Sequence, residues 1–279
     1  STVEEYDPIA DRWTRKANMP TPRYFLATSV VNGKIYAIGG EKIDAPFSVV
    51  EEYDPVEDKW TRKADLPFPR TCLSACTVNG KIYAIGGLVP KADPLSAAVE
   101  EYDPTTDKWT RKIDMPTARQ CLCTSVINGK IYAIGGIPDN WPAVSTVEEY
   151  DPVSNTWTKK ADVITARTYF TAVAINGKIL AIGGCKDWQW PGEAILAPGV
   201  EEYDPVTDKW TEKGTMPNPR MYCPASVVNE KIYVIGGLSS ANQVMTITEE
   251  YDPNASGKSI NFKGKLPTTW GNVRTVLNK

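Results

Sequence analysis

Hydrophobic and polar positions along this chain alternate in short runs, and the same arrangement of runs returns several times. Two apolar runs such as 26–31 and 34–38 are separated by an Asn-Gly pair. A tight hairpin turn needs positive φ at both of its central residues, so Asn-Gly at this place predicts two paired strands. No stretch shows the spacing of apolar residues that an amphipathic helix requires. The pattern therefore predicts an all-β fold.

Two motifs define the repeat. A segment that reads NGKIYAIGG at 32–40 occurs five times with small changes, and EEYDP occurs six times. Successive EEYDP tyrosines are separated by 47, 49, 48, 53 and 48 residues, at Tyr6, Tyr53, Tyr102, Tyr150, Tyr203 and Tyr251. A period of this length is typical of a propeller or array in which each unit is one supersecondary structure.

Each unit contains four predicted strands, named A to D in chain order. The Asn-Gly turn joins A to B, and a stretch of variable length leads to C. The Asp-Pro of EEYDP predicts the turn from C to D, because proline presets φ. Four short antiparallel strands per unit favour small sheets arranged radially with only short, protected edges.

The Gly-Gly pair, the EEYDP tyrosine and a tryptophan seven residues later together resemble the kelch repeat across nearly the whole chain. These tryptophans are Trp13, Trp60, Trp109, Trp157 and Trp210. The resemblance implies one domain, 1–279, folded as a six-bladed kelch β-propeller. Five complete four-stranded blades are expected from units at about 22–69, 70–117, 118–166, 167–218 and 219–267.

A sixth blade is expected to be closed by both ends of the chain. Residues 1–21 supply strands C and D, and 268–279 align with a strand A. Such closure joins the ring without an exposed edge. Nothing in the sequence corresponds to strand B of this blade. The sixth blade is therefore expected to be incomplete, unless its strand B was trimmed or comes from another chain.

Comparison of the units separates scaffold positions from variable ones. The distance from each tryptophan to the next Gly-Gly pair is always 26 residues, so all length variation falls in the B–C connection. A second variable zone is the start of strand A. Strand B ends where antiparallel strand A starts, so both zones must lie on one face of the disc, around the mouth of its central channel. We call this face the variable face.

The variable face is typically the binding face of kelch propellers. The resemblance implies contact positions just after Gly-Gly and at the start of strand A, and aromatic residues gather in the same zones. The candidate binding residues are Tyr24, Phe25, Glu41, Lys42, Phe47, Thr71, Cys72, Gln120, Cys121, Trp141, Thr168, Tyr169, Cys185, Trp188, Trp190, Met221, Tyr222, Trp270, Asn272 and Arg274. Trp188 and Trp190 stand in the longest connection, where rigid aromatic rings are typical ligand anchors. Arg274 stands where the other units have small residues. A role in binding and a role in filling space in the closing blade are equally compatible with this substitution.

Charged residues that recur in the units are assigned to the scaffold. An arginine precedes strand A in five units, as at Arg23, and a Glu-Glu pair opens every EEYDP. Recurrence favours a structural bond between blades over an anion site or catalytic carboxylates. The six cysteines form no C-x-x-C pair, so buried thiols are expected. Cys72 and Cys121 share an offset in adjacent units, which leaves a reactive or metal-binding pair open.

The composition of the chain excludes several classes of function. The 279 residues include 42% apolar residues, carry a net charge of −3 and contain no histidine. The missing histidine excludes Ser-His-Asp and Cys-His catalysis and histidine-held metals, and no P-loop or dinucleotide fingerprint is present. The sequence contains no basic patch of the kind that binds nucleic acid, and it contains no apolar run long enough to span a membrane. We expect no cofactor, no metal and a monomer.

The sequence therefore predicts a module that binds a peptide, protein loop, glycan or small molecule on its variable face. One alternative is a sugar or metabolite isomerase or cyclase with carboxylates at the channel mouth, since sialic-acid mutarotases also resemble this fold. Another is an engineered or recently amplified repeat scaffold. The compartment stays open. Free thiols favour the reducing cytoplasm, whereas the sequon at 254–256 favours the outside of the cell.

Overall fold

The described part of the chain is built from strands. The computed structural model describes residues 2–43, 45–89, 95–139, 142–188, 192–253 and 262–265, with only the main chain of Trp188 and of 262–265. Within these ranges it contains 26 strands. No helix in this part of the chain is long and apolar enough to cross a membrane.

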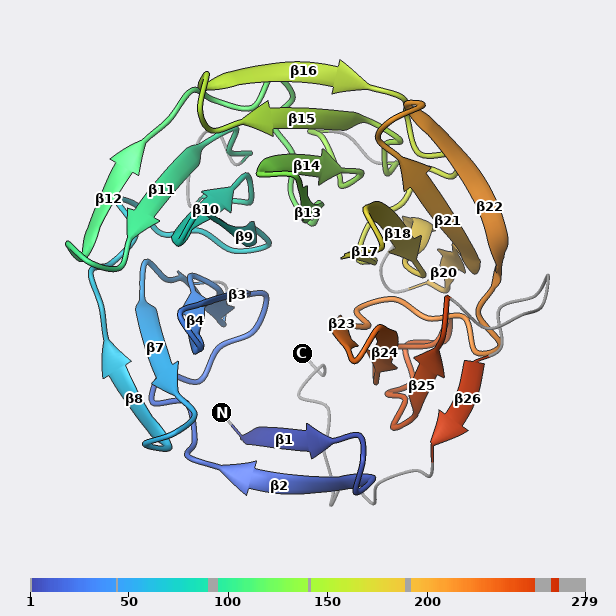
Figure 1. Cartoon of the computed structure of the whole chain (residues 1–279), viewed down its shortest axis with the longest axis horizontal. Coiled ribbons are helices and arrows are strands. Elements are labelled where there is room, and N and C mark those ends of the chain that lie inside the picture. The colour runs from blue at the N-terminus through green and yellow to red at the C-terminus, as the bar shows by residue number, and fades with distance from the viewer. Residues whose placement is uncertain are drawn as a thin grey trace.

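Five four-stranded antiparallel sheets, the blades, stand radially around a common centre (Figure 1). The innermost strands, A, are β3 (Ala27–Val31), β9 (Ser74–Val78), β13 (Cys123–Ile127), β17 (Thr171–Ile175) and β23 (Ala225–Val228). Strands B are β4 (Lys34–Ile38), β10 (Lys81–Ile85), β14 (Lys130–Ile134), β18 (Lys178–Ile182) and β24 (Lys231–Ile235). Strands C are β7 (Val50–Asp54), β11 (Val99–Asp103), β15 (Val147–Asp151), β21 (Gly199–Asp204) and β25 (Thr248–Tyr251). The outermost strands, D, are β8 (Lys59–Arg62), β12 (Lys108–Arg111), β16 (Thr156–Lys160), β22 (Lys209–Thr215) and β26 (Phe262–Lys265).

The remaining part of the ring holds a two-stranded sheet. β1 (Val3–Asp7) pairs with β2 (Arg12–Lys16), and the pair lies between the last blade and the first (Figure 1). These are the expected strands C and D of a closing blade. The expected strand A, at 268–279, lies outside the described residues. The all-β propeller is thus confirmed, with five complete blades, whereas the count of six is not.

The A–B hairpins have the predicted turn geometry. Asn32 and Gly33 adopt φ values of 51° and 75°, as a type I′ turn requires. Asn229 and Glu230 do the same in the last blade, with φ values of 50° and 60°. A glutamate thus occupies a left-handed position that glycine fills in the other four blades.

The hydrophobic core lies between neighbouring blades. One cluster joins Tyr36, Ile38 and Val50 of the first blade to Ile82 and Tyr102 of the second. Three further clusters repeat this arrangement between the following blades. A blade cannot bury its apolar faces alone, so the ring is stabilised by these contacts between neighbours.

A polar contact at the outer edge fixes the spacing of the blades. The indole nitrogen of Trp60 donates to the carbonyl of Ala17 at 3.0 Å. Asp58 Oδ1 accepts from the amide of Ala17 at 2.8 Å and from the hydroxyl of Tyr53 at 2.6 Å. Equivalent bonds join Trp109 to Ala64 and Trp210 to Ala161. These contacts explain why the tyrosine and tryptophan recur with one spacing.

The recurring arginines belong to the scaffold, as expected, but their side chains bond within one blade. Arg70 is fully buried and pairs with Glu100 of its own blade. Its main-chain carbonyl makes the contact between blades, accepting from the amide of Gly40 at 2.8 Å. The same buried ion pair recurs as Arg23 with Glu51, Arg119 with Glu148, Arg167 with Glu201 and Arg220 with Glu249. Removing one partner of such a pair typically costs about 3–5 kcal/mol.

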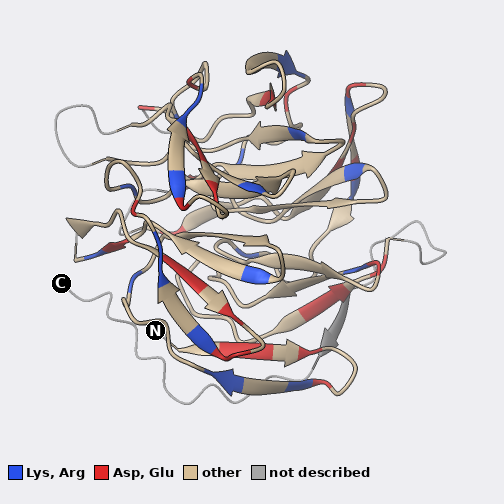
Figure 2. Cartoon of the chain, turned by 60° about the vertical axis from the view of Figure 1, so that its left-hand side comes forward, with Lys and Arg blue, Asp and Glu red and all other residues tan. Residues whose placement is uncertain are grey.

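Two B–C connections form small hairpins that the repeat does not predict. β5 (Glu41–Lys42) pairs with β6 (Ala45–Pro46), and β19 (Cys185–Trp188) pairs with β20 (Ala194–Leu196). Basic and acidic positions are interspersed over the strands, as Figure 2 shows. The features that distinguish the two faces are therefore the connections and not the overall charge.

Candidate binding site

The two variable zones of each blade lie side by side. The amide of Tyr24 donates to the carbonyl of Glu41 at 3.0 Å, and Glu41 donates back to Tyr24 at 2.9 Å. The same pairing of strand-A start and B–C connection joins Thr71 to Leu88, Gln120 to Ile137, Thr168 to Cys185 and Met221 to Leu238. The residues that directly follow these strand-A starts all line one hollow.

These central residues share an unusual backbone conformation. Their φ values lie between 52° and 55°, at Phe25, Cys72, Cys121, Tyr169 and Tyr222. A left-handed conformation is costly for bulky side chains. Main-chain bonds between blades hold it, because the amide of Cys72 donates to Phe25 at 3.0 Å and the amide of Cys121 donates to Cys72 at 2.8 Å. The amide of Tyr222 likewise donates to Tyr169 at 2.8 Å.

The five side chains converge on one hollow, which we call the mouth pocket. It has a volume of about 220 Å³ and is lined by Phe25, Leu26, Cys72, Leu73, Cys121, Leu122, Tyr169, Phe170, Thr171, Tyr222, Cys223 and Pro224. The rings of Tyr169 and Tyr222 stack with centroids 4.3 Å apart, and Phe25 extends the cluster to Tyr222 at 5.8 Å. None of these lining residues is an aspartate, glutamate, lysine or arginine.

Burial raises the pKa of several titratable groups that line the mouth pocket. Burial, together with the adjacent Cys72 thiol, raises the pKa of Cys121 well above its ordinary value. Burial also raises the pKa of the Tyr169 and Tyr222 hydroxyls. A thiol that is not ionised is a poor nucleophile and a poor metal ligand. No group of three or more acidic or cysteine side chains that could hold a metal occurs in the described residues.

Comparison with known proteins now decides the family. A family profile described as the Attractin/LZTR1 β-propeller matches residues 1–247. The chain belongs to the Attractin/LZTR1 β-propeller family. The kelch resemblance is confirmed, and kelch-type propellers commonly bind partners.

Short segments of this propeller also match curated proteins. Kelch-like protein 23 of Mus musculus is 39% identical over 70 residues, which are 25% of this chain and 12% of that protein. Spermatocyte protein spe-26 of Caenorhabditis elegans is 35% identical over 60 residues, 22% of this chain and 10% of that protein. This chain therefore spans only about a tenth of the length of either relative.

A solved structure shows the same fold. The structure titled "Structure of YjhT" matches 90% of this propeller and 87% of its own chain, with a TM-score of 0.78 and 17% sequence identity. Identity at this level supports the shared architecture alone.

The other candidate binding residues that were predicted from the sequence occupy several different environments. Thr71, Thr168, Met221 and Cys185 are buried beneath the face. Tyr24 and Lys42 are exposed, whereas Glu41, Phe47 and Gln120 are half-buried. Trp188 has its main chain in β19, but its side chain is not described. Trp141, Trp190, Trp270, Asn272 and Arg274 lie outside the described residues.

Part of the mouth lining is not among the residues predicted from the sequence. The unassigned lining residues are Leu26, Leu73, Leu122, Phe170, Thr171, Cys223 and Pro224. Most of them share one position of the repeat, and this position is apolar in every complete unit. Comparison of the units therefore assigns them to the scaffold and not to a binding site. These residues lie next to the five left-handed residues in the sequence, and residues adjacent to a pocket residue often line the same pocket. This adjacency could have identified them.

Proposed function

We propose that this propeller binds a partner through the variable face, with the mouth pocket as its centre. The observation that carries the proposal is the lining of that pocket, where aromatic rings, aliphatic side chains and cysteine side chains converge from five blades. Concave apolar sites with a few neutral polar groups are the usual form of a ligand pocket. Tyrosine rings add large rigid contact area at small cost in conformational entropy.

The expected ligand is a peptide or protein segment that presents an uncharged side chain. A buried charge without a partner is strongly unfavourable, so a lining without formal charge selects against a charged group in the pocket. The two stacked tyrosine rings favour an aromatic or aliphatic group on the ligand. A glycan or a small metabolite remains a second ligand class for the same pocket.

The isomerase alternative requires converging carboxylates at the mouth. Glu41 lies in β5, Asp187 lies in β19 and Glu193 precedes β20, so all three belong to the peripheral hairpins of the B–C connections. None of them lines the mouth pocket. General acid–base chemistry needs such groups within hydrogen-bond reach of the substrate. The described geometry therefore favours binding over carboxylate catalysis.

We further propose that the ring closes with a sixth blade. The pair β1–β2 occupies the remaining part of the ring (Figure 1), and the sequence of 268–279 aligns with a strand A. A ring with no open edge avoids the pairing with other chains that exposed strands invite. Such closure supports a single domain and a monomer.

The proposed function is tested by ligand screening with a matched pair of variants. Tyr222→Gly removes a ring from the mouth pocket and suits the left-handed conformation that Tyr222 adopts. Val206→Ala is the control, because Val206 is 91% exposed in a C–D turn of the opposite face. Peptide, glycan and metabolite mixtures are screened by thermal shift and native mass spectrometry.

We expect a ligand that stabilises wild type and Val206→Ala but not Tyr222→Gly, and that is recovered unchanged. Equal stabilisation of all three proteins would place the binding site elsewhere. A ligand recovered as an isomer or a cyclised product would instead support the enzyme alternative.

A further inference from the structure

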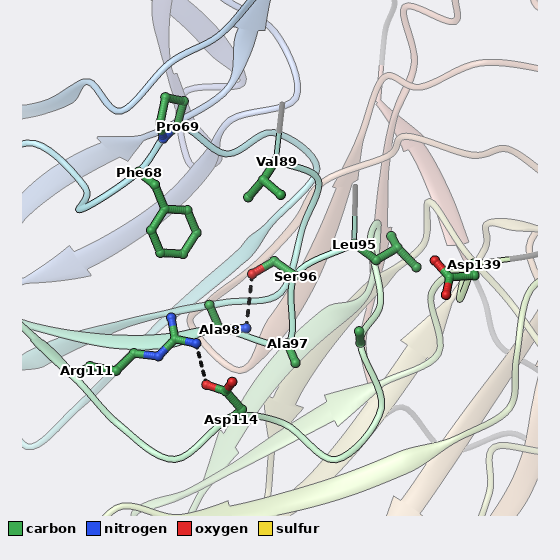
Figure 3. A pocket seen from close by; sticks show the side chains of 11 residues that line it. Phe68, Pro69, Val89, Leu95, Ser96, Ala97, Ala98, Arg111, Asp114 and Asp139 are labelled. Atoms are coloured by element: carbon green, nitrogen blue, oxygen red, sulfur yellow. Dashed lines mark hydrogen bonds and ion pairs between the residues drawn. The ribbon is translucent and has the colours of Figure 1, made fainter. Parts of the chain in front are cut away.

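A larger hollow lies on the same face at some distance from the centre. We call it the rim groove. Its volume is about 890 Å³, and its walls include Phe68, Val89, Leu95, Arg111, Asp114 and Asp139. Phe68 and Arg111 form one side and Asp139 stands across Leu95 on the other (Figure 3). The rim groove shares no residue with the mouth pocket, so binding in this groove is independent of the function proposed for that pocket.

Phe68 departs from the repeat. The equivalent positions of the other four complete blades carry Thr21, Thr117, Thr165 and Asn218. In three of these blades the side chain donates to the glutamate of the buried ion pair. These bonds are Thr21 to Glu51 at 2.7 Å, Thr117 to Glu148 at 2.9 Å and Asn218 to Glu249 at 2.7 Å. A phenyl ring cannot make this bond, so Phe68 does not serve the contact that this position makes in those three blades.

Arg111 supplies the missing bond. It reaches from β12 and donates to Glu100 at 2.6 Å, in the position that threonine occupies elsewhere. Its counterparts on neighbouring outer strands pair with an aspartate instead, Arg62 with Asp65 and Lys159 with Asp162, and neither makes such a bond to Glu51 or Glu148 among the described residues. The Phe68 ring thereby lies beneath two guanidinium groups, 5.1 Å from Arg70 and 5.9 Å from Arg111. Contacts of this length are favourable cation–π interactions, and they hold the half-buried ring in place.

The charge of the rim groove indicates the sign of its ligand. The guanidinium of Arg111 is neutralised by Glu100 and Asp114. Asp139 is exposed, and its carboxylate forms no ion pair with another described residue. The groove therefore offers an apolar wall with a fixed aromatic ring and, opposite that wall, an acidic group that no described residue neutralises. A cationic group complements this end of the groove.

We propose that the rim groove binds an extended peptide segment of a partner protein in which an aliphatic residue or a proline stands near a lysine or arginine. The apolar side chain covers Phe68, Val89 and Leu95, and the cation faces Asp139. A hollow of this size lies within the range of ligand sites. A fixed aromatic ring at its base is a typical binding hot spot.

The test uses an immobilised array of synthetic ten-residue peptides. One series carries a leucine or proline and a lysine separated by one to four glycine or serine residues, and the matched series replaces the lysine with glutamate. Phe68→Thr installs the residue that three of the other four complete blades carry at this position beside the same buried ion pair, so the variant should fold normally. Tyr222→Gly alters the mouth pocket and serves as the control for this groove.

We expect wild type and Tyr222→Gly to prefer the lysine series, and Phe68→Thr to bind it about tenfold more weakly, as loss of a hot-spot aromatic ring predicts. Asp139→Lys should reverse the preference toward the glutamate series, which a misfolded protein could not do. The proposal is overturned if wild type binds neither series or both equally, if Phe68→Thr binds like wild type, or if Tyr222→Gly loses binding as well.

Discussion

At the residue scale, some positions of the repeat carry only side chains of similar chemistry in different blades. Asp107 Oδ1 accepts from the Tyr102 hydroxyl at 2.6 Å and from the Ala64 amide at 2.9 Å. Asn155 does the same in the next blade, accepting from Tyr150 at 2.6 Å and from Ile113 at 3.2 Å. The position therefore needs an acceptor oxygen, and a carboxylate adds a charge that an amide lacks.

That charge makes stability depend on pH. The hydrogen bonds from Tyr102 and Ala64 lower the pKa of Asp107 in the folded protein. A carboxyl with a lower pKa when folded stabilises the protein above its unfolded pKa of about 4, and the stabilisation is lost as pH falls through the folded pKa. Asp107→Asn should therefore destabilise at pH 7 by at most about 1 kcal/mol, since solvent screens the exposed group.

The measurement is urea unfolding of wild type and Asp107→Asn at several pH values. The difference between the two proteins should shrink as pH falls through the lowered pKa of folded Asp107. Asn155→Asp is the reciprocal control, and it should gain the same pH dependence. A constant difference at all pH values would show that the charge of Asp107 contributes nothing.

At the element scale, the A–B hairpins offer a comparison within one molecule. Four blades place glycine at the second turn residue, whereas the fifth places Glu230 there with a φ of 60°. A left-handed conformation costs a residue with a side chain about 1–2 kcal/mol. Glycine avoids this cost but loses about 0.5–1 kcal/mol of entropy on folding. Glu230→Gly should therefore stabilise the protein by about 0.5–1 kcal/mol.

Thermal and urea unfolding of Glu230→Gly would measure the gain. Gly129→Glu is the matched control, because a Cβ at Gly129 meets no atom within 4 Å and the change tests backbone conformation alone. It should destabilise by a similar amount. Stabilisation by both substitutions would indicate that side-chain contacts, and not φ, decide the effect.

Local signals were sufficient for these elements and insufficient for others. The Asn-Gly and Asp-Pro turns carry their own backbone preferences, so the hairpins they join were predictable. The left-handed residues of the mouth pocket were not, because nothing local distinguishes Phe25 or Tyr169 from residues of an ordinary strand. Main-chain bonds between blades impose their φ. The small hairpins β5–β6 and β19–β20 also lie in stretches that no other unit repeats.

At the scale of the whole molecule, the sequence predicted a β-propeller but not the rim groove. That groove combines Phe68 before one blade, Arg111 on its outer strand and Asp139 from the next blade. In the sequence, each of these residues looks like an ordinary surface residue, because the groove exists only where neighbouring blades pack together. The substitution of Phe68 for threonine was visible in the sequence, yet its meaning depended on the glutamate that threonine contacts elsewhere.

The contacts between blades also provide a test of ring closure. A Cβ added at Gly135 would lie 2.4 Å from the carbonyl of Arg167 in the next blade. Gly39, Gly86 and Gly183 meet the following arginine carbonyl in the same way, at 2.5, 2.6 and 2.7 Å. Gly236 of the last complete blade meets only its own blade among the described residues, at Met245 O 3.5 Å away. The sixth blade that we propose would supply the equivalent neighbour.

We predict that Gly236→Ala is as destabilising as Gly135→Ala, because the proposed closing blade would cover Gly236. Overpacking and left-handed strain together suggest a loss of about 2–5 kcal/mol for each variant. Without a covering blade, Gly236→Ala would cost only the left-handed strain, about 1–2 kcal/mol. Urea unfolding of both variants decides between these values, with Gly80→Ala as a control for strain in open space. A loss at Gly236 that matches Gly80 would mean that the ring is not closed by a sixth blade at this seam.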